Sequence, residues 1–196
     1  MSNAAFARKR ADLTEQLVAL AQAEGFGRFA LRDLAAALGT SDRMLLYYFK
    51  SKAELVRAVL RRVSERLGAA LAGADAANPM APDRFLVQAM RQLGDPAISP
   101  LARIWAEAVA RGARGEAPYD QAADAAIGQW MDWIGGRLEG PPGPAKTGLA
   151  GLLLAFFEGT LLLELARPGS TRGAVETLQK LLAGGISSEG APPSRA

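Results

Sequence analysis

The stretch FALRDLAAALGTSDRMLLYYFKSKAEL, residues 29–55, decides the fold of this chain. Its first half repeats apolar residues at the i, i+3, i+4 and i+7 spacing of one helix face, and Gly39 follows as a C-terminal stop. Thr40 and Ser41 are candidate N-caps for a short second helix over about 42–48. A helix, a glycine turn and a short second helix predict a helix-turn-helix, in which the second helix can enter a DNA major groove.

A longer helix is expected on each side of this motif. The helix before it covers about 7–24 and ends at Gly25. The helix after it opens with Ser51 and Glu54 at capping-box spacing, so that each side chain can satisfy a backbone N–H group of the other residue. The stretch 73–82, GADAANPMAP, is rich in small residues and proline, and we expect it to join the head to the body.

The remaining sequence also has helical apolar spacing, and no convincing run alternates with period two. We expect body helices at about 83–94, 100–113, 119–139, 146–167 and 171–184. The sequence therefore predicts an all-α protein of about nine helices. We expect a DNA-binding domain over 5–52, a ligand-binding and dimerisation domain over 53–186, and a disordered Gly/Pro/Ser-rich tail over 187–196.

The composition excludes several classes of protein. The 196 residues include no cysteine and no histidine, so disulfides, Cys/His metal sites and catalysis by an imidazole or a thiol are impossible. No paired-carboxylate motif stands out, and we expect no enzyme activity, no metal and no cofactor. No secretory signal is present, and two carboxylates, Glu158 and Glu164, interrupt the longest apolar stretch. We therefore expect a cytoplasmic protein without a membrane partner.

Charge is unevenly distributed along the chain. Residues 1–66 hold 12 Lys and Arg against 7 Asp and Glu, a net charge of +5. Residues 67–196 hold 11 against 13, a net charge of −2. A basic first third on a mildly acidic remainder indicates a nucleic-acid contact surface at one end of the molecule.

The residues of the motif resemble those of the TetR family of bacterial regulators. That family's pattern is an Ile/Leu-Ala pair, a Gly-x-Ser turn, an aromatic-rich recognition helix that ends in Phe, and x-Ser-Lys-x-x-Leu. Here these elements are Leu34-Ala35, Gly39-Thr40-Ser41, Tyr47-Tyr48-Phe49 and Ser51-Lys52-Ala53-Glu54-Leu55, and the resemblance covers about residues 7–60. It implies a transcriptional regulator that binds DNA as a dimer and senses a small molecule through its body.

Three positions depart from the family pattern. Ala30 stands where Ser or Thr usually caps the second helix and touches a phosphate. Met44 stands where Thr is frequent, and Leu46 where Tyr is frequent. Each departure removes a hydroxyl group that would reach DNA, so the family's usual contacts at these positions do not carry over.

Several residues of the motif have side chains suited to DNA. Arg43 can contact O6 and N7 of a guanine with two N–H groups, or it is a solvated surface arginine. We assign Tyr48 to a phosphate and Tyr47 to a base edge or a sugar, with core packing as the alternative for either, and we expect Phe49 to be a core wedge. Lys52 is expected in the first turn of the fourth helix, where the helix dipole disfavours a positive charge. A phosphate bound at that N-terminus would offset this effect. The candidate DNA contacts are Arg32, Thr40, Ser41, Asp42, Arg43, Tyr47, Tyr48 and Lys52.

The last two helices are candidates for a homodimer interface. The segment 146–167 is apolar around much of its circumference, and its small residues recur near four-residue spacing. Two recognition helices related by a two-fold axis read a palindrome, which one helix cannot do. In the family the last two helices pair with their counterparts, and an ordinary core helix is the alternative here. The candidate interface residues are Gly148, Leu152, Ala155, Gly159, Leu178 and Leu182.

The body also offers candidates for a ligand pocket. Large aromatic side chains and isolated charges lie within apolar stretches of its helices, although core packing or salt bridges are alternatives for each of them. Glu158 has apolar residues on both sides, and we expect it to orient a ligand. The candidate pocket residues are Arg103, Trp105, Glu107, Trp130, Trp133, Phe156 and Glu158.

The sequence thus predicts a repressor that binds a palindromic operator in double-stranded DNA and is released by a small, mostly apolar effector. One rival is a helical enzyme or lipid carrier with a decayed head, which would ignore DNA. A second rival is an architectural DNA-binding protein without a sensor. Such a protein would bind DNA with little sequence preference and would not respond to an effector.

Overall fold

The computed structural model describes residues 3–27, 29–72 and 78–184, and every regular element in these ranges is a helix. The helices are α1 (Asn3–Glu24), α2 (Leu31–Ala37), α3 (Asp42–Phe49), α4 (Lys52–Ala72), α5 (Pro82–Leu93), α6 (Ser99–Ala113), α7 (Tyr119–Arg137), α8 (Pro144–Ala166) and α9 (Arg172–Ala183). The expectation of an all-α protein of about nine helices is confirmed. Part of the expected head–body junction, 73–77, and the expected tail, 187–196, lie outside the described residues.

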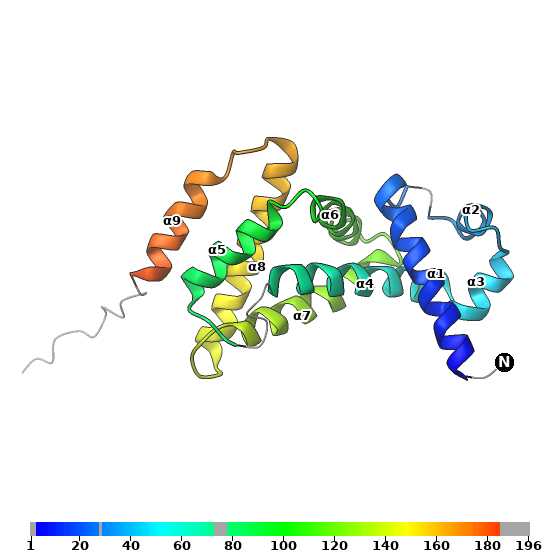
Figure 1. The fold of residues 1–196 in the computed structure, drawn as a ribbon, viewed down its shortest axis with the longest axis horizontal. Coiled ribbons are helices and arrows are strands. Elements are labelled where there is room, and N and C mark those ends of the chain that lie inside the picture. The colour runs from blue at the N-terminus through cyan, green and yellow to red at the C-terminus, as the bar shows by residue number, and fades with distance from the viewer. Residues whose placement is uncertain (1–2, 28, 73–77, 185–196) are drawn as a thin grey trace, which may run out of the picture.

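Helices α1–α3 form a head at one end of the elongated molecule, and α9 lies at the other end (Figure 1). The head closes around side chains that are almost completely buried, because each helix turns one apolar face inward. The central members of this core are Leu17, Leu34, Leu45, Phe49 and Leu55. The burial of Phe49 confirms its expected role as a core wedge.

Helix α4 connects the head to the body. It packs against α1 and α3 on the head side and against α6 and α7 on the body side. Its last carbonyl groups accept hydrogen bonds from other body helices: Gln88 Nε2 donates to the oxygen atoms of Leu71 (3.2 Å) and Ala72 (2.7 Å), and Arg137 donates to the oxygen of Ala72 (3.4 Å). Because these groups would otherwise lack partners at a helix end, the bonds fix the C-terminus of α4 to α5 and α7. A displacement of α5 or α7 would therefore be transmitted directly to α4.

The outer face of α8 is apolar and exposed. Its inner face, with Ala150, Leu153 and Phe157, packs on the core, while Leu152 and Leu162 are 48% and 63% exposed. By length and composition α8 is also long and apolar enough to cross a membrane, although its inner face is occupied by this chain's own core. An exposed apolar face of this kind is typical of an interaction surface.

Helix α9 packs along α5. None of its residues is fully buried, and Leu181 is 64% exposed. Leu178 and Leu182, two of the expected interface residues, are partly buried against the chain's own core. The four expected interface residues on α8, Gly148, Leu152, Ala155 and Gly159, are all exposed.

Candidate DNA interface and effector cavity

The turn between α2 and α3 fixes the direction of the recognition helix. Gly39 has φ of +60°, a conformation that glycine adopts without strain, and the N–H of Thr40 donates back to the oxygen of Ala35 at 2.9 Å. Ser41 then caps α3, because its Oγ accepts the N–H of Met44 at 3.2 Å. Of the two candidate caps, Ser41 is confirmed.

Helix α3 presents an outer face that mixes charged and apolar side chains. Asp42 and Arg43 are exposed, and so are Met44, Leu46 and Tyr47, at 41%, 38% and 49%. Three large apolar groups on one short exposed helix are unusual for a surface without a partner. On DNA, such groups can contact thymine methyl groups in the major groove. Met44 and Leu46 therefore offer apolar contacts where the family frequently has hydroxyl groups that form hydrogen bonds.

The two tyrosines of α3 have different surroundings. Tyr48 is buried, and its ring packs against Phe6 with 5.0 Å between the centroids. Tyr47 is exposed and meets Phe6 and Tyr48 edge-on, while the Lys50 ammonium lies 5.8 Å from its ring centre. The ring of Tyr48 therefore packs in the core of the head, while the assignments of Tyr48 to a phosphate and of Tyr47 to a base edge or a sugar stay predictions. The sequence reasoning did not single out Phe6 or Lys50.

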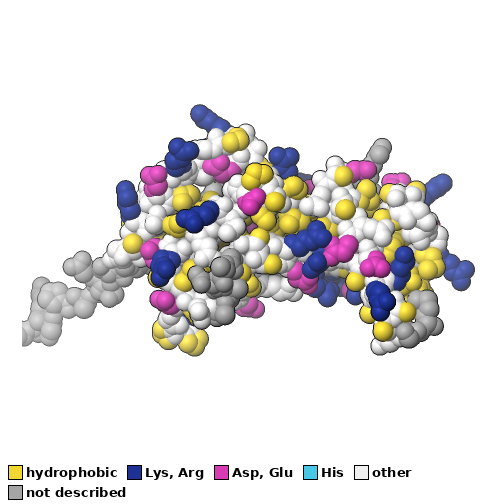
Figure 2. Space-filling view, viewed as in Figure 1, with side chains coloured by type: hydrophobic (Ala, Val, Ile, Leu, Met, Phe, Trp, Pro, Cys, Tyr) yellow, Lys and Arg dark blue, Asp and Glu magenta, His cyan; other side chains and the backbone are white. Residues whose placement is uncertain are grey.

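The N-terminus of α4 is arranged as a possible phosphate site. Ser51 Oγ accepts the N–H of Glu54 at 3.1 Å, which is half of the expected capping box. The other half is absent, because the Glu54 carboxylate pairs with Arg57 instead. Lys52 lies in the first turn and is half-buried. Arg32 on α2 is exposed and Thr40 in the turn is half-exposed, so they too are available to a partner. Figure 2 shows Lys and Arg side chains at this end of the molecule.

Residues 13–59 match the family model of bacterial regulatory proteins, tetR family. The head is thus similar in sequence to the DNA-binding heads of the TetR family. No curated protein matches the sequence. Among solved structures, one from Rhodococcus sp., assigned to the TetR family, is 18% identical, with a TM-score of 0.69 over 89% of this chain and 96% of that one. A transcriptional regulator from Rhodococcus sp. RHA1 is 24% identical (TM-score 0.66, 89% and 94%), and a TetR transcriptional regulator from Legionella pneumophila is 20% identical (0.59, 92% and 97%). These likenesses show that about nine-tenths of the chain, the body included, has the TetR-like fold.

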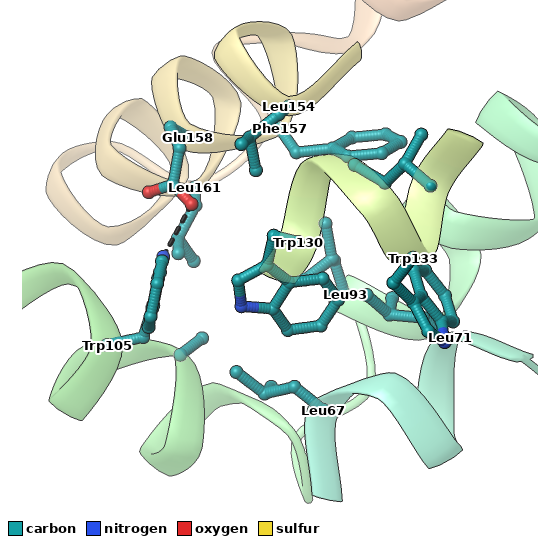
Figure 3. A pocket seen from close by; sticks show the side chains of 12 residues that line it. Leu67, Leu71, Leu93, Trp105, Trp130, Trp133, Leu154, Phe157, Glu158 and Leu161 are labelled. Carbon is teal, nitrogen blue, oxygen red and sulfur yellow. Dashed lines mark hydrogen bonds between the residues drawn. The ribbon is translucent and has the colours of Figure 1, made fainter. Parts of the chain in front are cut away.

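Behind this TetR-type head, the body contains a partly enclosed apolar cavity of about 40 Å³. Its walls come from α4 to α8, and Figure 3 shows the side chains that line it. Four of the seven expected pocket residues are among them: Trp105, Trp130, Trp133 and Glu158. The other three lie elsewhere. Arg103 lines a surface groove, Phe156 is not part of the cavity wall, and Glu107 contacts the TetR-type head.

Glu158 is the charged group of the cavity wall. One of its carboxylate oxygens accepts a hydrogen bond from Trp105 Nε1 (Figure 3). Burial raises the pKa of Glu158, and the hydrogen bond from Trp105 opposes that rise. No ion pair of Glu158 is found within residues 3–27, 29–72 and 78–184.

Replacing Glu158 with glutamine is expected to stabilise the protein at neutral pH and not at acid pH. Because the folded state raises the pKa of Glu158, it holds the proton more tightly than the unfolded state does. The carboxyl group therefore lowers the free energy of unfolding as the pH rises from 4.5, its ordinary pKa, through the raised pKa of the folded state. Urea unfolding of both proteins at pH 4 and pH 7 measures the difference. A gain in stability for Glu158→Gln that is the same at both pH values would contradict this account.

Glu107 connects the body to the head. Its Oε2 accepts the N–H of Phe26, just beyond α1, at 3.0 Å, and its Oε1 accepts from Arg111 Nε at 3.0 Å. The Phe26 ring lies 5.1 Å from the ring of Tyr119 on α7, and the Arg111 guanidinium covers the same tyrosine at 5.2 Å. Gly25 makes this approach possible: a Cβ there would lie 2.7 Å from Glu107 Oε2. These contacts form a second link between head and body besides α4.

The Glu107→Ala variant is expected to lose about 1–3 kcal/mol of stability, because it leaves the Phe26 N–H without its partner and Arg111 without one of its carboxylates. Chemical denaturation measures the loss. The control is Glu24→Ala at the exposed end of α1, which is expected to change stability by less than about 0.5 kcal/mol. Equal losses in the two variants would show that the link contributes nothing.

Proposed function

We propose that this protein is a transcriptional regulator that binds a palindromic operator as a homodimer and is released from it by a small organic effector. The observation that supports this most is the exposed face of α3. Its arginine, tyrosine and large apolar side chains follow a glycine turn and a serine cap that direct the helix outward. The TetR-like fold supports the same function. With neither histidine nor cysteine in the sequence, we propose a role without catalysis.

The exposed stripe of α8 supports the homodimer. Ala145, Gly148, Leu152, Ala155, Gly159 and Leu162 follow one another at alternating spacings of three and four residues, and all are exposed. This spacing places them on one side of the helix, as in a coiled-coil seam. A Cβ added at Gly148 or Gly159 would meet nothing within 4 Å in this chain, so a neighbouring backbone can approach closely there. We propose a second copy of the chain as the occupant, rather than a membrane.

The position of the cavity supports effector control. Helices α4 and α6 both contribute to its walls, through Leu67 and Trp105 for example, and both contact the head. An effector that binds better to an expanded cavity would favour a different placement of α4 and α6. The two heads of the dimer would then change their spacing and lose the operator. The energy for release is the difference between the effector's affinities for the two arrangements.

Two variants of the head test the DNA-binding part of this function. The Lys52→Ala variant is expected to weaken binding to all duplexes about equally and to lower the salt slope by about one, because it removes a phosphate contact. The Arg43→Ala variant is expected to relax preference at one base pair of each half-site, at a cost of about 1–3 kcal/mol. Fluorescence anisotropy on duplexes with single base-pair changes, at several salt concentrations, measures both effects. If Arg43→Ala keeps the full preference, Arg43 does not read a base.

The same measurements separate the rival functions. A lipid carrier with a decayed head would bind none of the duplexes. An architectural protein would bind all of them with one affinity, and neither variant would alter the preference among them. The proposed regulator binds some duplexes much more tightly than others.

A further inference from the structure

Glu158 is a charge that the fold alone does not explain. Among the described residues that line the cavity, it is the one with an acidic side chain, and the others are aliphatic or aromatic. It accepts a hydrogen bond from Trp105, and no cation among the described residues pairs with it. A buried carboxylate without a cation is costly, whereas leucine or methionine at this position would complete an apolar core. A ligand that carries a positive charge would remove this cost.

The tryptophans around Glu158 are also suited to a cation. The rings of Trp105 and Trp130 lie 6.2 Å apart at 68°, and those of Trp130 and Trp133 lie 5.3 Å apart at 82°. Figure 3 shows Trp105 beside Glu158, with Trp130 across from it. Indole faces attract organic cations more strongly than other aromatic side chains do. A carboxylate and several indoles in one water-poor site thus favour the same class of ligand.

We propose that the cavity binds an organic monocation, with its charged group next to Glu158 and its apolar part against the indoles of Trp105 and Trp130. This inference rests on the proposed function and names the chemical class of its effector. Trp130 adds a second requirement. Its Nε1–H is buried and donates to no described residue, so a ligand with a hydrogen-bond acceptor would satisfy it.

The cavity must open to admit such a ligand. A volume of about 40 Å³ holds little more than a few water molecules. Beside it lies a surface groove of about 810 Å³ between α5, α6, α8 and α9, and Leu93 and Leu161 line both spaces. Displacing these two side chains would join the groove to the cavity, which provides an entry route. Expansion of the cavity would also displace its walls on α4 and α6, two helices that contact the head.

The groove offers a competing chemistry. Three arginines, Arg91, Arg103 and Arg172, line it together with Glu164 and Glu176. A ligand with an anionic head group would bind at these arginines and place only its tail in the cavity. The two possibilities predict opposite charge preferences. We favour the cation because Glu158 is inside the cavity, whereas Arg91, Arg103 and Arg172 are exposed to solvent.

Three probes of similar shape and different charge test the proposal: choline, its uncharged carbon isostere 3,3-dimethylbutan-1-ol, and the anion 3,3-dimethylbutanoate. All three tryptophans of the chain line the cavity, so the intrinsic fluorescence of the full-length protein reports on this site. Choline is expected to bind about tenfold more tightly than the alcohol, and the anion least tightly. If choline causes no more change than the alcohol, or if the anion binds best, the proposal is wrong.

Matched variants test whether Glu158 is the group that causes the preference for a cation. The Glu158→Gln variant keeps an oxygen that can accept from Trp105 and is expected to bind choline and the alcohol equally. The Asp132→Asn variant removes an exposed carboxylate of α7 that lines neither the cavity nor the groove, and it is expected to keep the preference for choline. A preference for the anion that Arg103→Gln abolishes would place the ligand in the groove and overturn the proposal. The titration contains no DNA, so its result is independent of the DNA-binding experiments that test the proposed function.

Discussion

Replacing Leu152 and Leu162 together with glutamate is expected to convert the protein to a monomer and to weaken operator binding by about 10²–10⁴-fold. Both side chains are exposed on α8 in the isolated chain, so the substitution does not disturb this chain's own core. In the proposed dimer it would bury several carboxylates without partners, which is strongly unfavourable. A monomer has one recognition helix and loses the advantage of binding two half-sites together.

Light scattering and anisotropy measure the two effects of this double variant. The parent protein should have twice the chain mass of 20.6 kDa at micromolar concentration. The control is Ile127→Glu, at an exposed apolar residue of α7, which is expected to leave both the mass and the DNA affinity unchanged. If the double variant remains a dimer, the interface lies on another surface of the molecule.

Replacing Phe49 with alanine is expected to destabilise the protein by about 3–5 kcal/mol and to abolish DNA binding. Phe49 ends the recognition helix with its ring in the core of the head, and the Arg10 guanidinium lies over that ring at 5.4 Å. Removing the ring leaves a cavity where α1, α3 and α4 meet, so α3 loses its fixed position.

The control for Phe49→Ala is Met44→Ala on the same helix. Met44 lies on the outer face of α3 and is not part of the buried core, so its replacement is expected to cost less than about 1 kcal/mol while altering DNA preference. Thermal unfolding and anisotropy measure both variants. If Phe49→Ala binds DNA as the parent does, the recognition helix does not depend on this wedge.

Most of the fold was predictable because local signals mark the helix ends. Gly39 and Ser41 define the central turn, and the Pro- and Gly-containing breaks of the body place the other ends within a few residues of those observed. Helix α1 differs most, since it begins at Asn3 rather than near Ala7. That extra turn brings Phe6 into contact with both Tyr47 and Tyr48, a contact that the expected helix boundary did not include.

The composition of the cavity was only partly predictable, because apolar spacing does not show which face of a buried helix meets which neighbour. Residues two apart on a helix point to nearly opposite sides. With Trp105 in the cavity, Arg103 and Glu107 must therefore lie away from it, in the groove and at the head. No local pattern predicts the contact between Glu107 and Phe26, because they are 81 residues apart. The packing of α9 on α5 likewise depends on tertiary structure.

Selection of duplexes from a pool of random sequence by the purified full-length protein tests the central claim most directly. The account predicts enrichment of an inverted repeat whose half-sites lie about one helical turn, or a multiple of it, apart. Enrichment should disappear in the Leu152→Glu/Leu162→Glu variant. A pool that remains random after repeated rounds, or that converges on a site without two-fold symmetry, would contradict the account of a dimeric, operator-reading regulator.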